Sequence, residues 1–265
     1  MKVPLIRLFI TLGILVLAAL ILSLNHFYGW FVISTPSFNE TYVSLRFDDG
    51  LKTQLRAYEL LNKYNLTGSI YILTEKSSNP SDWEKDYYMN WSEIENVSSI
   101  MEIGGHTRNH ADLPKSALEG TLEDEIKGCY DDLVEHGFEP KTFVYPYGNY
   151  NKKVVDETKK YFECASTQDV GVNTVPIEPY RLKDFTVRSF SSVDDVKRVL
   201  KPGTWIILTF HDIGNVSSNI PDLERKVMEN NAVSVELFEE TLKYLNETSD
   251  IKVVTMAEGC SLFKK

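Results

Sequence analysis

The stretch YVSLRFDDG, residues 42–50, has the pattern of a β-strand that ends in two adjacent carboxylates. Apolar and polar residues alternate along it, as in a strand with one apolar face. Asp48 and Asp49 follow directly, ahead of the turn-forming Gly50. An Asp-Asp-Gly sequence by itself is more often a strand running into a turn than a functional site. Its meaning therefore depends on which other polar residues share that end of the fold.

A second stretch, HTRNH at residues 106–110, carries two histidines at a spacing that suits a shared cation. His106 and His110 are four residues apart, which puts both imidazoles on one face of a helical turn or compact loop. Such a pair alone is as often two ordinary surface or core histidines. The chain has only five histidines, however, and His106, His110 and His211 each lie at or near the end of an apolar, strand-like run. That placement favours a metal site over packing.

Strand and helix patterns alternate along the chain. Strand-like runs occur at residues 42–48, 68–73, 101–105, 141–145, 162–167, 185–190, 204–210 and 251–255. Helical spacing occurs between them, at 52–64, 92–100, 116–137, 152–161 and 235–245. The run TWIILTF at 204–210 is apolar almost throughout, as expected of a parallel strand buried on both faces. This alternation predicts a parallel, right-handed β/α fold, either an open sheet or a barrel.

The polar residues at the strand ends decide between these two folds. Seven of them fall at or near the carboxyl ends of five different predicted strands: Asp48 and Asp49, His106 and His110, Tyr147, Arg188, and His211. In a β/α barrel such ends converge on one mouth, which is where these folds place their chemistry. We therefore expect a barrel.

The N-terminus has the features of a membrane span. Residues 8–24 (LFITLGILVLAALILSL) carry no charge and follow Lys2 and Arg7. A cluster of aromatic residues comes after them, at 27–31. As a helix this run is about 25 Å long, nearly the thickness of the hydrocarbon core. The positive flank favours a cytoplasmic N-terminus. We predict an anchor at 1–28, a linker at 29–40 and a folded domain at 41–265, outside the cytoplasm.

A cleaved signal peptide is the alternative to an anchor, and it would make the protein secreted. The apolar run is longer than the usual core of a signal peptide, and no Ala-x-Ala-like site follows it. Either interpretation predicts export.

The charge balance argues against nucleic acid or another polyanion as a partner. The chain has 28 basic and 38 acidic residues; without Lys2 and Arg7, 26 basic residues remain, a balance of −12. Six Asn-x-Ser/Thr sequons fit an exported glycoprotein: Asn39, Asn65, Asn90, Asn96, Asn215 and Asn246. The three cysteines, Cys129, Cys164 and Cys260, fit buried free thiols, and a disulfide between two of them stays open.

The motifs together resemble the polysaccharide deacetylase family, the NodB-homology domain of carbohydrate esterase family four. The likeness covers roughly residues 41–258, in the family's motif order. It implies a distorted (β/α)7 barrel, here preceded by the N-terminal transmembrane helix. It also implies site roles: Asp48 as general base, Asp49, His106 and His110 as metal ligands, the backbone N–H of Tyr147 as an oxyanion donor, and His211 as general acid.

Three features depart from the family pattern. Val144 stands where the third motif usually has an arginine that orients the base, the Asp-and-Trp fourth motif is not recognisable, and Thr209 replaces a usual leucine. A carboxylate base still needs a cation or hydrogen bonds to set its pKa and direction. We expect Arg188 to supply this partner, with Arg46 as the second candidate.

The resemblance implies one divalent metal ion, Zn²⁺ in the first place, with Co²⁺, Ni²⁺ and Mn²⁺ as alternatives. The expected activity removes N-acetyl groups from N-acetylhexosamine units of an envelope or extracellular polysaccharide. An O-acetyl esterase or small-molecule amidohydrolase would use the same chemistry. A glycan-binding module without catalysis is the alternative of a different class.

Overall fold

A parallel β-sheet forms the centre of the protein in the computed structural model, which describes residues 39–216 and 220–264. The strands are β1 (Thr41–Phe47), β2 (Gly68–Ile72), β3 (Met101–Gly105), β4 (Thr142–Val144), β5 (Cys164–Val170), β6 (Leu182–Thr186), β7 (Trp205–Phe210) and β8 (Ile251–Val253). Their order is β2-β3-β4-β5-β6-β7-β1-β8, and a further pairing of β1 with β2 closes the first seven into a barrel. The predicted seven-stranded β/α barrel is confirmed.

Strand β1 closes the ring, and one of its edges pairs with two different strands. Along one edge it pairs with β7 from Tyr42 to Phe47. On the other edge, Arg46 and Phe47 pair with β2, whereas Thr41, Tyr42 and Val43 pair with β8. All residues of β1 and β7 are buried, as the apolar pattern of residues 204–210 predicted.

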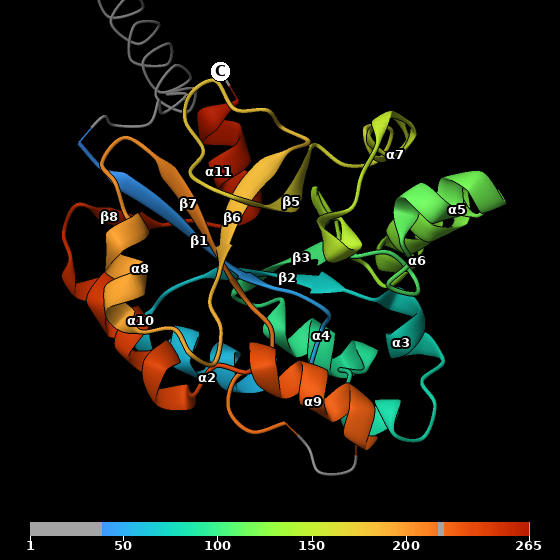
Figure 1. The fold of residues 1–265 in the computed structure, drawn as a ribbon, viewed down its shortest axis with the longest axis horizontal. Coiled ribbons are helices and arrows are strands. Elements are labelled where there is room, and N and C mark those ends of the chain that lie inside the picture. The colour runs from blue at the N-terminus through green and yellow to red at the C-terminus, as the bar shows by residue number, and fades with distance from the viewer. Residues whose placement is uncertain (1–38, 217–219, 265) are drawn as a thin grey trace, which may run out of the picture. The chain divides into compact units, whose positions relative to one another are not determined.

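The helices lie around the outside of this barrel (Figure 1). They are α2 (Gln54–Tyr64), α3 (Thr74–Ser78), α4 (Trp91–Val97), α5 (Leu113–Glu119), α6 (Cys129–Glu135), α7 (Lys152–Thr158), α8 (Val193–Val199), α9 (Asp222–Asn231), α10 (Val235–Glu247) and α11 (Met256–Phe263). Two 3-10 turns, η1 (Glu84–Asp86) and η3 (Pro146–Gly148), and a π-helical turn, η2 (Asp124–Gly128), complete the elements.

Two predicted elements differ from the structure. The helix expected at 116–137 is divided, because Gly120 ends α5 in the left-handed region with φ 83°. The strand expected at 185–190 is β6 at Leu182–Thr186, which leaves Arg188 beyond the strand.

Helix α11 covers the N-terminal end of the barrel. The backbone N–H groups of Met256 and Ala257 donate to Ser69 and Glu102 inside the barrel, at 2.8 and 2.9 Å. Gly259 lies so close to Trp205 that a Cβ there would be 2.3 Å from the indole ring. Because this end is filled, the carboxyl ends of the strands form the open end.

Cys164 on β5 and Cys260 on α11 form a disulfide, and Cys129 is a buried free thiol. The predicted pattern of three free thiols is therefore wrong, and the disulfide that the sequence left open is present. The predicted membrane helix at 1–28 lies outside the described residues. Within residues 39–216 and 220–264, no helix is long and apolar enough to cross a membrane.

Candidate active site

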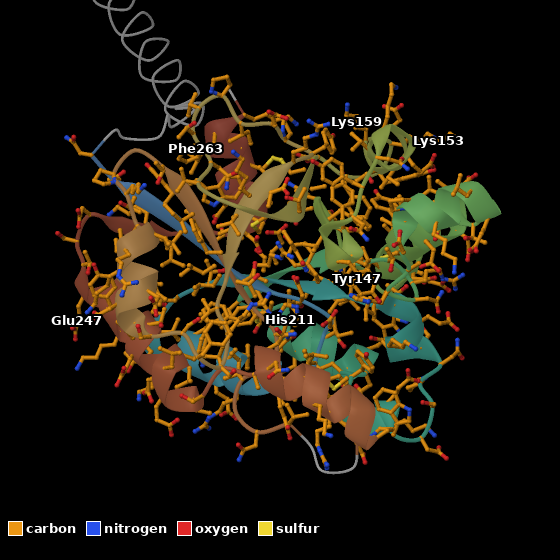
Figure 2. All side chains as sticks on the ribbon, in the orientation of Figure 1. Tyr147, Lys153, Lys159, His211, Glu247 and Phe263 are labelled. Atoms are coloured by element: carbon orange, nitrogen blue, oxygen red, sulfur yellow. A yellow bond between two sulfur atoms is a disulfide. The ribbon has the colours of Figure 1, made fainter. Side chains whose placement is uncertain are left out.

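All seven residues singled out at the strand ends line one cavity of about 390 Å³. The remaining lining residues are Leu73, Tyr87, Tyr88, Gln168, Thr186, Asp212, Met228 and Asn231. Tyr147 and His211 both lie near the middle of the view in Figure 2, over the strand ends. The convergence that the barrel geometry predicted is therefore present.

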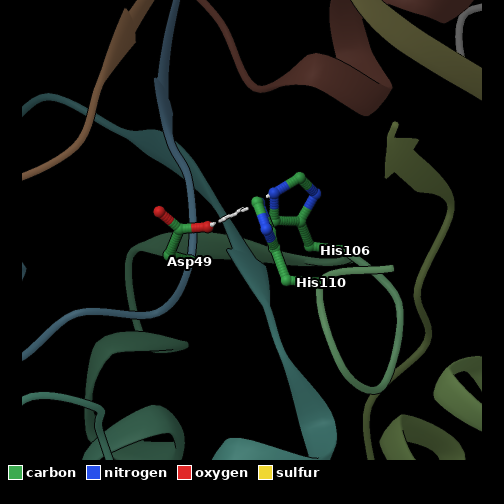
Figure 3. Close-up of side chains that lie close together, drawn as sticks. All are labelled: Asp49, His106 and His110. Carbon is green, nitrogen blue, oxygen red and sulfur yellow. Dashed lines mark ion pairs between the residues drawn. The ribbon is translucent and has the colours of Figure 1, made fainter. Parts of the chain in front are cut away.

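Asp49, His106 and His110 point toward one another (Figure 3) and offer ligand atoms that all lie within 4.8 Å of each other. Oδ1 of Asp49 is 3.3 Å from Nε2 of His106 and 3.5 Å from Nε2 of His110. That oxygen is buried and has no hydrogen-bond partner within the described chain. Two imidazole nitrogens and one carboxylate oxygen are the donor set of an open, catalytic type of metal site. The three residues thus fit a divalent ion.

The protonation of the two histidines suits this role. Nδ1 of His106 lies 2.8 Å from the backbone carbonyl of Val144, which can only accept, so Nδ1 carries the proton and Nε2 is left for a ligand. Burial lowers the pKa of His110 to about 4, although Asp49 opposes the shift. The imidazole of His110 is therefore neutral at pH 7 and has a lone pair to offer.

Strained backbone accompanies these ligands. Asp49, Thr107, His110 and Tyr147 have positive φ values of 78°, 71°, 60° and 59°, and Asn65 is the remaining non-glycine example among described residues. Such conformations cost free energy and persist only where surrounding contacts impose them. Their concentration at one cavity marks this place as the functional site.

Hydrogen bonds hold the loop of residues 106–110 in this shape. The Thr107 hydroxyl accepts from the N–H of His110 at 2.9 Å. The carboxylate of Glu125 accepts from the backbone and side-chain nitrogens of Asn109, both at 3.0 Å. Arg108 pairs with three carboxylates of neighbouring helices. The ligands are therefore positioned before any ion binds.

The partner of Asp48 is Arg46, not Arg188 as we expected first. Nε and Nη2 of Arg46 donate to the two oxygens of Asp48 at 2.7 and 2.5 Å. Nη1 donates to Asp184 at 3.2 Å, and all three side chains are almost fully buried. Burial raises the pKa of Asp48, but the charge and hydrogen bonds of Arg46 outweigh it and leave that pKa below its usual range. Asp48 is thus held ionised with a fixed orientation.

Arg188 lines the same cavity, but its guanidinium donates to the side-chain oxygen of Asn231 on α9. The first-choice assignment failed because the strand ends at Thr186 and Arg188 lies past it. Arg46 is two residues before Asp48 on the same strand and therefore on the same face, which was the signal for the second candidate.

His211 follows β7 and faces Asp48. Its Nε2 is 4.0 Å from Oδ2 of Asp48. Its Nδ1 is buried without a partner in the described chain, as is Oδ1 of Asp184. The two groups of the expected acid–base pair therefore adjoin the same space. The remaining predicted residue, Tyr147, is 56% exposed, and its ring packs edge-on to His110 with centroids 4.5 Å apart.

Several polar residues of the site lie outside the sequence motifs, and three of them make the hydrogen bonds that support it. Asp184 bonds Arg46 and Thr209. Asp212 accepts hydrogen bonds from Thr53 and Tyr87, both at 2.8 Å. Gln54 donates to the backbone carbonyls of Asp48 and His211 and so links the ends of β1 and β7. A signal existed for Asp184 alone, which alternates in phase with the buried Leu182.

Fold and site together define a parallel β/α barrel with a candidate Asp-His-His metal centre beside a buried carboxylate and an imidazole. Residues 35–162 match the model of the family described as polysaccharide deacetylase. The resemblance that the motifs indicated is thus confirmed over residues 35–162, a segment that contains Asp48, Asp49, His106, His110 and Tyr147.

Solved structures agree with this resemblance. A polysaccharide deacetylase from Bacillus cereus is 27% identical, with a TM-score of 0.53, and the match covers 60% of this chain and 51% of that one. A peptidoglycan deacetylase from Bacillus subtilis is 18% identical over 85% of this chain and 93% of its own, with a TM-score of 0.57, and it supports the fold. The chain thus spans about half the length of the Bacillus cereus protein. Among curated proteins the chain has no significant match.

Proposed function

We propose that this protein is a metal-dependent hydrolase that removes N-acetyl groups from N-acetylhexosamine units of an envelope or extracellular polysaccharide. The observation that carries the proposal is the placement of the Asp49, His106 and His110 triad in the same cavity as Asp48 and His211. A glycan-binding module needs neither a base nor an acid beside a metal centre, so the arrangement favours catalysis.

A divalent ion held by Asp49, His106 and His110 would polarise the acetamide carbonyl and lower the pKa of water at the site. Zn²⁺ suits the donor set, and Co²⁺, Ni²⁺ and Mn²⁺ suit it too.

The chain's own residues supply the proton transfers. Asp48 is oriented by Arg46 to accept a proton from the water that attacks the carbonyl carbon. His211, on the other side of the same space, protonates the departing amine. The backbone N–H of Tyr147 is assigned to the carbonyl oxygen. The new C–O bond forms as water adds to the carbonyl carbon, and the C–N bond then breaks as the amine leaves, so that the products are acetate and a glycan with a free amino group.

We further propose that the domain lies outside the cytoplasm, anchored by the predicted helix at 1–28. Disulfides persist in oxidising compartments, and the pair Cys164 and Cys260 fits such a location. The asparagines of all six sequons are exposed, as glycosylation would require.

The proposal is tested by acetate release from N-acetylated oligosaccharides by the full chain in detergent. We expect activity to vanish after chelation and to return with Zn²⁺. In the Asp48→Asn variant, metal content should be retained while turnover falls by at least about a hundredfold. Faster release from O-acetylated than from N-acetylated glycans would point to the esterase, and metal binding without any acetate release would point to a binding module.

A further inference from the structure

Arg188 stands apart from the other arginines that the structure describes. Each of the others lies within salt-bridge distance of a carboxylate: Arg46, Arg56, Arg108, Arg181, Arg198 and Arg225. Within the described residues Arg188 has no such partner, and its guanidinium bonds the neutral amide of Asn231. A guanidinium offers five donors in a planar fork that matches a carboxylate. Arg188 therefore retains unused capacity to bind an anion.

The position of Arg188 is fixed by its surroundings. Its backbone N–H donates to the Ser191 hydroxyl at 3.0 Å, which closes a turn after β6. The neighbouring Ser189 hydroxyl donates to the carbonyl of Asn230 near the end of α9, at 3.1 Å. Asn231 then holds the guanidinium itself. The side chain is thus partly ordered before a ligand arrives, which lowers the entropy that binding must overcome.

Arg188 is also the only lysine or arginine among the described residues that line the catalytic cavity. The acids of that cavity are already engaged. Asp48 is paired with Arg46, Asp49 belongs to the metal triad, and Asp212 accepts hydrogen bonds from Thr53 and Tyr87. An anionic group of a bound glycan would therefore have one available cationic side chain within the same cavity as Asp48, His211 and the metal triad.

We propose that Arg188 determines specificity by binding a carboxylate on the sugar next to the acetylated unit. The substrate would then be a glycan in which N-acetylhexosamine is followed by an acidic sugar. This inference rests on the proposed function and names the substrate class of the same site. The net negative charge of the chain disfavours binding of a densely charged polyanion. The expected substrate is therefore a glycan with a single carboxylate in each repeat.

A purely structural role for Arg188 makes a different prediction. A cation near the C-terminus of α9 interacts favourably with the helix dipole and the last carbonyl groups. Loss of that interaction would lower the stability of α9, and it would weaken the binding of neutral and acidic substrates alike. A preference between substrates separates the two roles.

The test compares kcat/KM for acetate release from three oligosaccharides of matched length. The first is neutral poly-N-acetylglucosamine. In the second, N-acetylglucosamine alternates with a hexuronic acid, and in the third it alternates with a sugar that bears a lactyl-ether carboxylate. The two acidic glycans distinguish the sources of the carboxylate. We expect the wild type to prefer one of them, and Arg188→Gln to reduce the ratio of acidic to neutral kcat/KM by roughly tenfold.

Two further variants sharpen the comparison. Asn231→Asp keeps Arg188 but gives it an internal carboxylate partner, and we expect the preference to fall as it does in Arg188→Gln. Arg198→Gln removes the same charge from the exposed face of α8, outside the cavity, and is the matched control that should leave the ratio unchanged.

Calorimetric binding of the same oligosaccharides gives a readout that is independent of turnover. The preference for the acidic glycan should weaken as NaCl is raised, because the contact is partly exposed. Arg188-dependent binding without acetate release would sustain this inference and overturn the proposed activity. Acetate release with a ratio that Arg188→Gln and Asn231→Asp do not change would overturn the inference and sustain the activity.

Discussion

At the scale of single residues, the arginine that orients Asp48 comes from the same strand, β1, and not from β4. The family pattern places the orienting arginine at the position of Val144 on β4, whereas here Arg46 on β1 binds both oxygens of Asp48. The backbone of Val144 instead accepts the Nδ1 proton of His106. An arginine thus still binds this carboxylate, but from another position in the sequence.

We predict that Arg46→Gln abolishes acetate release and lowers the free energy of unfolding by about 3–5 kcal/mol, because it leaves Asp48 and Asp184 buried without a cation. Arg46→Lys keeps the charge but cannot form the planar fork, so we expect it to be intermediate. Urea denaturation and acetate release provide the measurements.

The control for this prediction is Arg56→Gln, which removes an exposed ion pair with Glu59 and should cost less than about 1 kcal/mol. A fully active Arg46→Gln variant with wild-type stability would show that Asp48 needs no cation.

Individual site residues could be predicted from the sequence only where a local signal marked them. Asp48, Asp49, His106, His110 and His211 stand at strand ends, so the barrel rule brought them together. The contact of Arg46 with Asp184 spans 138 positions, and only the folded barrel shows it. Asp212 and Gln54 carry no local pattern that distinguishes them from ordinary polar residues.

At the scale of elements, strand existence was easier to predict than element boundaries. The run at residues 204–210 is close to β7, because a strand buried on both faces is apolar throughout. The prediction of one helix at 116–137 was wrong. The helical spacing of the sequence continues past Gly120, but the backbone there enters the left-handed region and ends α5. The expected strand at 185–190 was displaced because apolar residues continue beyond the last paired residue of β6.

For helix α11 we predict that Gly259→Ala destabilises the fold by about 1–3 kcal/mol, since the new methyl group would overlap the rigid indole of Trp205. Ser261→Ala, on an exposed position of the same helix, should change stability by less than about 0.5 kcal/mol. Thermal unfolding of both variants makes the comparison. Equal melting temperatures would mean that α11 is not packed against β7.

Glu102, which binds the N-terminus of α11, gives a pH-dependent prediction. Burial raises its pKa above the unfolded value of about 4.3, although bonds from Thr142, Ala257 and Ser69 partly oppose the shift. A raised carboxyl pKa favours the folded state below the unfolded pKa, and this advantage is lost as pH rises through the folded pKa.

We therefore expect wild type to lose stability relative to Glu102→Gln as pH rises from about 4, by roughly 1.4 kcal/mol for each unit between the two pKa values. Denaturant unfolding of both proteins from about pH 4 to pH 8 measures the difference. A difference that does not change with pH would show that Glu102 does not titrate differently on folding.

At the scale of the whole molecule, the alternation of strands and helices was enough to predict a barrel, and the polar strand ends predicted where its chemistry lies. The disulfide could not be assigned, because three cysteines allow three pairs and the partners are 96 residues apart. The structure joins β5 to α11 and so connects the wall of the barrel to the helix that covers its N-terminal end.

We predict that Cys164→Ser with Cys260→Ser lowers the free energy of unfolding by about 2–5 kcal/mol, because the disulfide closes a long loop of the unfolded chain. The metal triad lies at the opposite end of the barrel, so zinc binding to the folded variant should match wild type. Cys129→Ser, at the free thiol, is the control. Loss of zinc affinity in the double variant at temperatures where it stays folded would contradict this separation.

The shared edge of β1 also bears on how the protein is made. Thr41, Tyr42 and Val43 pair with β8, whereas Arg46 and Phe47 pair with β2, early in the sequence. Strand β1, the first of the described strands, therefore cannot complete its pairing until β8, the last of them, has been synthesised. Pairings so distant in sequence form slowly, and an unpaired strand edge invites association with other chains. During synthesis, one edge of β1 therefore stays only partly paired until β8 is available.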